Sequence, residues 1–233
     1  MQASEPSRAV FVSDVHSNLE ALEAVLEEAG GLRVFCAGDV VGYGASPNEV
    51  VGLLRRVGAT CVQGNHDRAA VTGDVRGFNP TAGMAAVWTS RQLTDESRGF
   101  LAALPTGARG TVGGRSLYMV HGSPDDPLWE YVLPSTHADL LDHYLGKVGA
   151  DVLALGHTHA PFEWRGEGLV FNPGSVGQPR DGDPRASYAV LCAEGGRVEV
   201  ELRRVEYDVE RSARKVLASG LPPSLSSRLL SGR

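Results

Sequence analysis

Five short apolar runs each end in a turn that carries an acid, an amide or an imidazole: VFVSDVH, VFCAGDV, CVQGNHD, LYMVHGS and VLALGHTH. Each run has the length and the β-branched content of a buried strand. Loops at the carboxyl ends of parallel strands converge on a common crevice, so side chains far apart in sequence can meet there. These polar positions therefore predict a single site, and they are Asp14, His16, Asp39, Asn65, His121, His157 and His159.

Strands and helices alternate through the first third of the chain. The strands are expected at 8–13, 33–37 and 60–63, with a helix at 18–29 and a second helix that starts near Ser46. Ser46 and Pro47 are a typical cap and first-turn proline. Because parallel strands need such crossovers, a layered α/β sheet follows.

The remainder predicts more helix and then a second sheet. Residues 68–104 are Ala-rich and mostly helical, and a further helix is expected near 138–145. Strands are expected at 109–112, 116–120, 152–155, 169–171, 188–193 and 198–205, with glycine pairs at 113–114 and 195–196 as tight turns. We expect these strands to form one largely antiparallel sheet.

No repeat or linker divides the chain, so residues 1–233 are expected to form a single domain. After Asp208 the sequence predicts one helix and then a frayed end from about residue 219.

Charge and composition exclude some classes of partner. Lys and Arg total 22 against 28 Asp and Glu, a net charge of -6, so no global field attracts long nucleic acid. The N-terminus lacks a signal pattern, and no apolar run approaches the ~20 residues that span a bilayer. We therefore expect a cytoplasmic protein that acts on a small ligand, without a membrane partner, and a homo-oligomer stays an open alternative.

The residue types at the strand ends indicate a metal site. Asp14 and His16 lie two apart, so in an extended loop both side chains can point the same way, and His157 and His159 repeat this spacing. One such motif is often only a turn with hydrogen-bonding side chains. Five together favour metal binding, and mixed imidazole and carboxylate ligation suits Mn, Fe, Co or Zn better than Ca.

The segments SDVHSN, AGDVVGYG, GNHD, VHGS and GHTH make residues 8–180 resemble the calcineurin-like metallophosphoesterases. The resemblance implies a four-layer αββα sandwich with two mixed β-sheets, and a phosphoric ester hydrolase with two divalent transition metal ions (Mn, Fe or Zn). It assigns the first ion to Asp14, His16, Asp39 and His159. It assigns the second to Asp39, Asn65, His121 and His157, with Asp39 bridging the two ions.

The implied chemistry is hydrolysis of a phosphate ester. Two cations about 3.5–4 Å apart can share a hydroxide and neutralise phosphate oxygens during in-line attack. Besides Asp39, the resemblance makes His66 catalytic, because it would stabilise or protonate the leaving oxygen; alternatively, His66 only hydrogen-bonds within its loop. For Asp67 we expect loop hydrogen bonding.

Two residues separate this chain from the protein-phosphatase branch of the family. That branch has GD-x-VDRG, whereas Gly42 and Tyr43 stand here in place of the acid and the arginine. GDVVGYG and the later NPGSVGQPR look like the small bacterial phosphodiesterase branch instead.

Three residues are candidates for substrate binding, each with a structural alternative. Asn18 could be a helix-terminal residue, Tyr43 a packing residue, and Arg180 an exposed arginine after a glycine turn.

The sequence thus favours hydrolysis of a small phosphodiester, such as a nucleotide derivative. Alternatives are hydrolysis of a dinucleoside tetraphosphate, or a phosphomonoesterase or protein phosphatase activity. A non-enzymatic alternative is a metal-binding scaffold of the same fold, like the family's retromer subunit, although that subunit lacks catalytic histidines that are present here.

Overall fold

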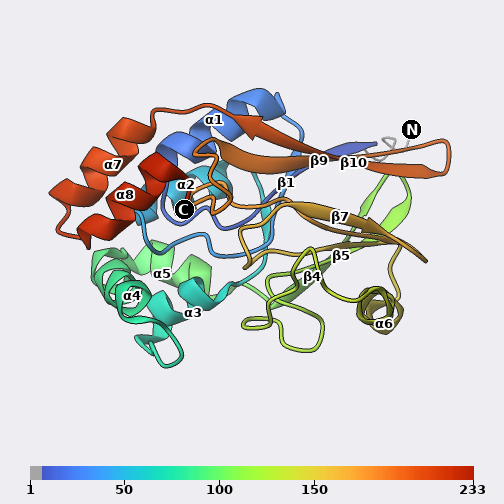
Figure 1. Cartoon of the computed structure of the whole chain (residues 1–233), viewed down its shortest axis with the longest axis horizontal. Coiled ribbons are helices and arrows are strands. Elements are labelled where there is room, and N and C mark those ends of the chain that lie inside the picture. Colours follow the sequence, from blue (N-terminus) through green and yellow to red (C-terminus); the bar gives the residue numbers. More distant parts are fainter. Residues whose placement is uncertain (1–6) are drawn as a thin grey trace.

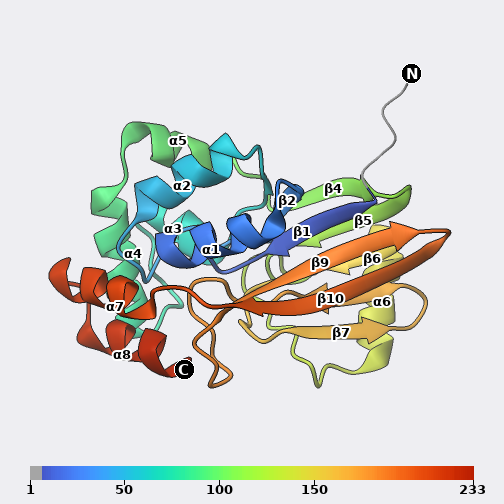
Figure 2. The same cartoon turned by 90° about the horizontal axis from the view of Figure 1, so that it is seen from above.

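The computed structural model describes residues 7–233, which contain two five-stranded sheets stacked face to face (Figures 1 and 2). The first sheet has the order β10 (Arg197–Val205), β9 (Ala186–Glu194), β1 (Arg8–Val12), β2 (Arg33–Cys36) and β3 (Thr60–Cys61). The second has the order β4 (Gly107–Val112), β5 (Arg115–Val120), β6 (Val152–Ala154), β8 (Leu169–Asn172) and β7 (Phe162–Arg165). Both sheets mix parallel and antiparallel pairs.

Helices cover the outer faces of both sheets and one end of the stack (Figure 2). They are α1 (Leu19–Ala29), α2 (Pro47–Arg56), α3 (Asn65–Thr72), α4 (Pro80–Gln92), α5 (Asp95–Ala102), α6 (Ala138–Val148), α7 (Val209–Ala218) and α8 (Pro223–Ser231). Within residues 7–233, none of them combines the length and apolarity that crossing a membrane would require.

Alternate side chains of β1 point to opposite faces of the first sheet and so contribute to two different layers. Val10 and Val12 point toward α1 and α2, whereas Phe11 points into the space between the sheets. There Phe11 stacks on Phe35 at 4.9 Å between ring centroids and meets the edge-on ring of Phe171 at 5.1 Å. With α6 packed on the far side of the second sheet, the expected four-layer αββα sandwich is confirmed.

The expected membership of the second sheet was wrong for β9 and β10. β9 pairs antiparallel with β1, with Ala9 opposite Leu191, so the hairpin extends the first sheet. The second sheet is also not largely antiparallel, because β5, β6 and β8 run parallel, and it includes β7, which the sequence did not indicate. Alternation tells which face of a strand is buried but not which strand lies beside it.

The expected frayed end was also wrong, because α8 is a packed helix. Leu221, Leu225 and Leu229 are buried against α4, α7 and the ring of Tyr43. Leu225 and Leu229 are four apart on one face of α8, and Leu221 lies just before the helix begins. The tail therefore helps to cover the end of the sandwich where the strand exits meet.

Candidate metal centre

Backbone hydrogen bonds tie the loop after β1 to the loop after β2, and the loop after β5 to the loop after β6. The amides of Asp14 and His16 donate to the carbonyls of Gly38 and Asp39, each at 3.0 Å. The Gly156 amide donates to the His121 carbonyl at 2.9 Å. The predicted convergence of the strand exits therefore has a direct physical cause in the loop backbone.

Most of the predicted ligands sit on strained backbone. Positive φ values between 47° and 68° occur at Asp14, His16, Asp39, His157 and His159. Non-glycine residues seldom adopt this left-handed conformation, and such strain clusters at functional sites. The paired motifs therefore do not use the extended loops that we expected; left-handed turns aim their side chains into one cavity.

One cluster contains Asp14, His16 and His159, all buried. The Nε2 atoms of the two histidines lie 3.1 Å apart, and His159 Nε2 lies 3.3 Å from Asp14 Oδ1. Asp39 Oδ2 is 3.7 Å from His16 Nε2. The structure thus brings together the four residues that the resemblance assigned to the first ion.

A second cluster contains Asp39, His121 and His157. His121 Nε2 lies 3.4 Å from Asp39 Oδ2, 3.2 Å from His157 Nδ1 and 3.2 Å from Asn65 Oδ1. Asp39 lies between the two clusters, where a bridging carboxylate would have to be.

Hydrogen bonds at the far side of the rings show that the first cluster fits a cation. His16 Nδ1 faces the Val41 carbonyl at 3.1 Å, and His159 Nδ1 faces the Gln178 carbonyl at 2.6 Å. A carbonyl only accepts, so each Nδ1 carries the proton and each Nε2 presents a lone pair. Two lone pairs 3.1 Å apart, next to the buried Asp14 Oδ1 that has no donor of its own, repel unless a positive ion lies between them.

The protonation of the histidines agrees with this reading. Burial lowers the pKa of His16 and His159 well below the usual range, so both rings are neutral at pH 7. Burial would lower the pKa of His121 as well, but the Asp39 carboxylate outweighs it and raises this pKa to about 9. The second cluster therefore also favours a positive charge, at the nitrogen that a metal ion would bind.

Asp39 is ionised in spite of its burial. Desolvation alone would raise its pKa, but neighbouring His121 and His66 hold the pKa well below its usual range. Its Oδ1 accepts from the His66 amide at 2.8 Å, which leaves Oδ2 facing both clusters.

His66 lies beside the clusters and outside the ligand set that the resemblance assigned. Its ring lies between Tyr43 and Phe78, with centroids at 4.4 and 4.7 Å, and 4.9 Å from that of His16. Its Nδ1 is buried with no hydrogen-bond partner, so the alternative of a ring that only braces its loop has no support from the contacts at Nδ1. The expected bracing comes instead from Asp67, which accepts from the amides of Val41 and Gly64 at 2.9 Å each.

Tyr43 and Arg180 line the cavity above the ligands. Tyr43 is 5% exposed, and its ring meets that of His16 edge-on at 4.6 Å. The Arg180 guanidinium lies over the Tyr43 ring at 5.9 Å and contacts its hydroxyl at 3.5 Å. Arg180 is thus positioned at the cavity rather than on a remote exposed turn, and substrate binding by either residue stays a prediction.

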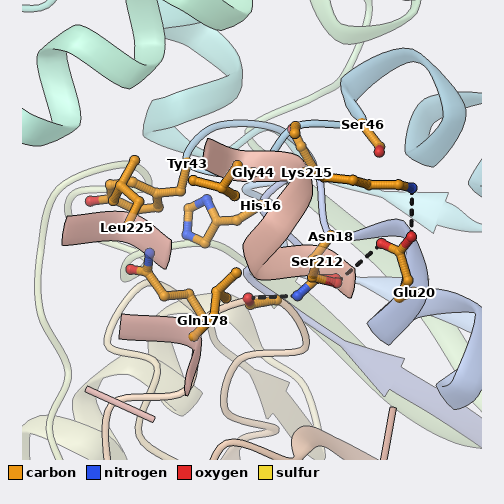
Figure 3. A pocket seen from close by; sticks show the side chains of 15 residues that line it. His16, Asn18, Glu20, Tyr43, Gly44, Ser46, Gln178, Ser212, Lys215 and Leu225 are labelled. Carbon is orange, nitrogen blue, oxygen red and sulfur yellow. Dashed lines mark hydrogen bonds and ion pairs between the residues drawn. The ribbon is translucent and has the colours of Figure 1, made fainter. Parts of the chain in front are cut away.

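Asn18 does not line this cavity but a neighbouring pocket, which Figure 3 shows. Its side chain caps α1 by accepting from the Ala21 amide at 3.3 Å, and it donates to the Gly177 carbonyl at 3.0 Å. Ser212 of α7 joins it to the buried carboxylate of Glu20, which also binds Lys215 (Figure 3). These contacts give Asn18 a structural task, and its substrate-binding role stays an untested prediction.

In the glycine-rich segment before Arg180, the polar side chains form hydrogen bonds to the loops that carry the metal ligands. Asn172 Nδ2 donates to the Gly156 carbonyl at 2.7 Å, and Ser175 Oγ donates to the Asp14 carbonyl at 2.7 Å. The donors that could have gripped a phosphate in this turn are thus already used.

Sequence reasoning missed an aromatic wall along the cavity, formed by Phe78, Trp129 and Tyr131. Phe78 meets Trp129 edge-on at 5.1 Å, and Tyr131 lies against His157 at 4.1 Å between centroids. Trp129 and Tyr131 are 38% and 56% exposed. Their one signal in the sequence is the presence of large aromatic residues in an otherwise polar, proline-containing loop.

Comparison with known proteins agrees with this geometry. Residues 8–196 match the family described as the calcineurin-like phosphoesterase superfamily domain. The protein MJ0912 of Methanocaldococcus jannaschii is 36% identical over 97% of this chain and 99% of its own length. The phosphodiesterase YfcE of Escherichia coli is 31% identical over 78% of this chain and 85% of its own.

Solved structures show the same likeness. The crystal structure of a metallophosphoesterase from Sphaerobacter thermophilus has a TM-score of 0.83 at 37% identity, and the match covers 97% of this chain and 99% of that one. Motifs, fold and buried histidine–aspartate clusters lead to one conclusion: the chain belongs to the calcineurin-like phosphoesterase superfamily and is a metallophosphoesterase.

Proposed function

We propose that the protein is a dinuclear metal-dependent phosphodiesterase that hydrolyses a small phosphodiester. The observation that carries this proposal is the pair of buried histidine–aspartate clusters on either side of Asp39 Oδ2, which lies 3.7 Å from His16 Nε2 and 3.4 Å from His121 Nε2. Two divalent ions held by these clusters would supply an activated water and would neutralise charge on the phosphate oxygens.

The chain's own residues orient the ester. Arg180 supplies a guanidinium fork at the cavity rim, a geometry that matches phosphate oxygens. His66 lines the same cavity, and its Nδ1, which is buried against Gly42, makes no hydrogen bond, so no bond at Nδ1 ties the ring to its loop and the imidazole can stabilise or protonate the leaving oxygen. Tyr43 supports both, because its ring touches His66 and its hydroxyl touches Arg180.

Two features favour a diester over a phosphoprotein. Gly42 and Tyr43 replace the acid and arginine of the protein-phosphatase motif, so the grip on a dianionic monoester is reduced to Arg180. The cavity is narrow, about 60 Å³, and walled by Phe78 and Trp129, which suits apolar ester arms. The similar Escherichia coli protein is named as a phosphodiesterase, in line with this choice.

A metal-reconstituted substrate screen tests the proposal. Bis-p-nitrophenyl phosphate, p-nitrophenyl phosphate, cyclic nucleotides and dinucleoside polyphosphates are compared with Mn, Fe or Zn added. We expect the diester to be preferred over the monoester. Preference for the monoester would overturn the diester assignment, and no hydrolysis with any metal, despite a filled site, would support the scaffold alternative.

An Asp39→Asn variant sharpens the test, because the lost carboxylate charge should weaken both metal sites. Asp95→Asn is the matched control, since Asp95 is exposed on α5 and does not line the cavity. We expect metal content and hydrolysis to fall together in the first variant and to stay at the wild-type level in the second.

A further inference from the structure

A second, polar groove adjoins the cavity over the metal ligands. It is lined by α3, by the turn before α4 and by the loop between β5 and α6, and its volume is about 460 Å³. The lining side chains that matter here are Asn65, Arg68, Asp74, Arg76 and Trp129. Asn65 and Trp129 also line the cavity over the ligands, so the groove continues from it. The turn before α4 meets the β5–α6 loop at the edge-on contact of Phe78 with Trp129, and Figure 1 shows the α3–α4 region and this loop below the sheets.

The two arginines of the groove differ in what they bind. Arg76 is held by Asp74, with Nε at 2.9 Å from Oδ1 and 3.0 Å from Oδ2. Arg68 makes no side-chain hydrogen bond or ion pair to any residue within 7–233. With Arg68 and Arg76 against Asp74, the groove therefore carries a net positive charge, on a chain whose net charge is -6.

Helix geometry places the guanidinium of Arg68 on the same side of α3 as Asn65, which lines the cavity over the metal ligands. Arg68 follows Asn65 by three positions in α3, and residues three apart are neighbours on one helical face. Across the groove stands the ring of Trp129, which is 38% exposed and held edge-on by Phe78. A guanidinium opposite an aromatic wall offers a site for an anionic group attached to an organic arm.

Resting on the proposed phosphodiesterase function, we propose that this groove binds a further phosphate group carried on one arm of the diester, and that Arg68 determines this specificity. Phosphate is the anion chosen because the Arg fork pairs with it bidentately. The substrate class is then a phosphodiester whose nucleoside-like arm bears a second phosphate. An ordinary solvated arginine would give no such preference.

A matched pair of substrates isolates the second phosphate. One is the p-nitrophenyl diester of thymidine 5′-phosphate, and the other is the same diester with an added 3′-phosphate. We expect wild-type kcat/KM to be higher for the phosphorylated diester by about tenfold, the size of one charge-assisted hydrogen bond at a partly exposed site. In Arg68→Met this ratio should fall to about one.

Arg56→Met is the matched control. Arg56 is exposed at the end of α2 and lines neither cavity, so its loss removes the same charge without touching the groove. The wild-type ratio should survive in it. The proposal is overturned if the wild type shows no preference, if Arg68→Met keeps the preference, or if Arg56→Met loses it equally.

A binding measurement separates this proposal from the proposed function. Calorimetric titration of the manganese-loaded protein compares thymidine 3′,5′-bisphosphate with thymidine 5′-monophosphate, and it needs no turnover. Hydrolysis of neither diester would reject the proposed function, yet about tenfold tighter binding of the bisphosphate, lost in Arg68→Met, would still support the groove. Equal affinities in the wild type would reject the groove, whatever the activity.

Discussion

The close contact between Gly42 and the His66 ring predicts a variant that should lose catalysis but keep its metal ions. A Cβ atom added at Gly42 would lie 2.5 Å from His66 Nδ1 and 3.0 Å from its Cγ. Ordinary contact begins at 3.4 Å, so the imidazole in Gly42→Ala must move by about 0.9 Å. The three atoms nearest to the added Cβ, at distances up to 3.1 Å, all belong to His66. None of them belongs to the seven predicted metal ligands.

Both the kinetic and the stability effects can be estimated. A misplacement of about 1 Å at a reacting centre costs about a hundredfold in rate, so kcat for bis-p-nitrophenyl phosphate should fall about a hundredfold. The φ of +101° at Gly42 is strained for any L side chain, which adds a loss of about 1–3 kcal/mol in the free energy of unfolding. Turnover, metal content and urea denaturation are measured on the same sample.

Gly58→Ala separates strain from contact. Gly58 also has a positive φ, +65°, but an added Cβ would meet no atom within 4 Å. This control should lose about 1–2 kcal/mol of stability and keep the wild-type kcat. The reasoning is refuted if Gly42→Ala turns over at the wild-type rate, or if it loses activity only because its metal ions are lost.

Three further predictions concern His66, Asp67 and Glu20. His66→Ala should lower kcat about 10²–10⁴-fold with unchanged metal content, as measured by turnover and elemental analysis, and a full rate would reject its role. Asp67→Ala should cost about 2–6 kcal/mol in urea denaturation because two buried amides lose their acceptor; a cost under about 1 kcal/mol would contradict this. Burial alone would raise the pKa of Glu20, but Lys215 and other partners outweigh it and lower this pKa below 4.5. The ionised Glu20 therefore stabilises the folded protein above about pH 4.5, and this stabilisation is lost as the pH falls through the lowered pKa. Glu20→Gln should therefore be less stable than wild type by about 1–2 kcal/mol at pH 7, with a difference that shrinks toward pH 4; a difference independent of pH would argue against the ion pair.

The metal centre could be predicted from sequence because its chemistry restricts residue types. A metal ligand must be an acid, amide or imidazole, and the strand exits carry these at Asp14, His121 and His157. The conformation of the loops could not be predicted in the same way. The left-handed φ of Asp14 and His157 arises from hydrogen bonds between loops that are far apart in sequence, such as the one between the His157 amide and Asp14 Oδ2 at 3.1 Å.

The sheet to which β9 and β10 belong could not be predicted from the hydrophobic alternation of the sequence. β9 is buried along most of its length, which fits a central strand of either sheet. Its place beside β1 follows from tertiary pairing, Val10 opposite Val190, which no periodicity records.

The last helix and the aromatic wall were missed for different reasons. Leu225 and Leu229 of α8 do have helical spacing, but the segment is short and rich in Ser and Pro, so a frayed end had the stronger composition signal. Phe78, Trp129 and Tyr131 lie in loops, where no helical or strand period indicates the role of an aromatic residue.

We expect two metal ions that share Asp39 to drive diester hydrolysis. The most direct test follows the rate of bis-p-nitrophenyl phosphate hydrolysis as manganese is titrated into metal-free protein, with bound metal counted per chain. We predict that hydrolysis rises as the second equivalent binds and that Asp39→Asn neither fills both positions nor turns over. Full activity at one ion per chain, or two bound ions without any hydrolysis, would contradict the claim.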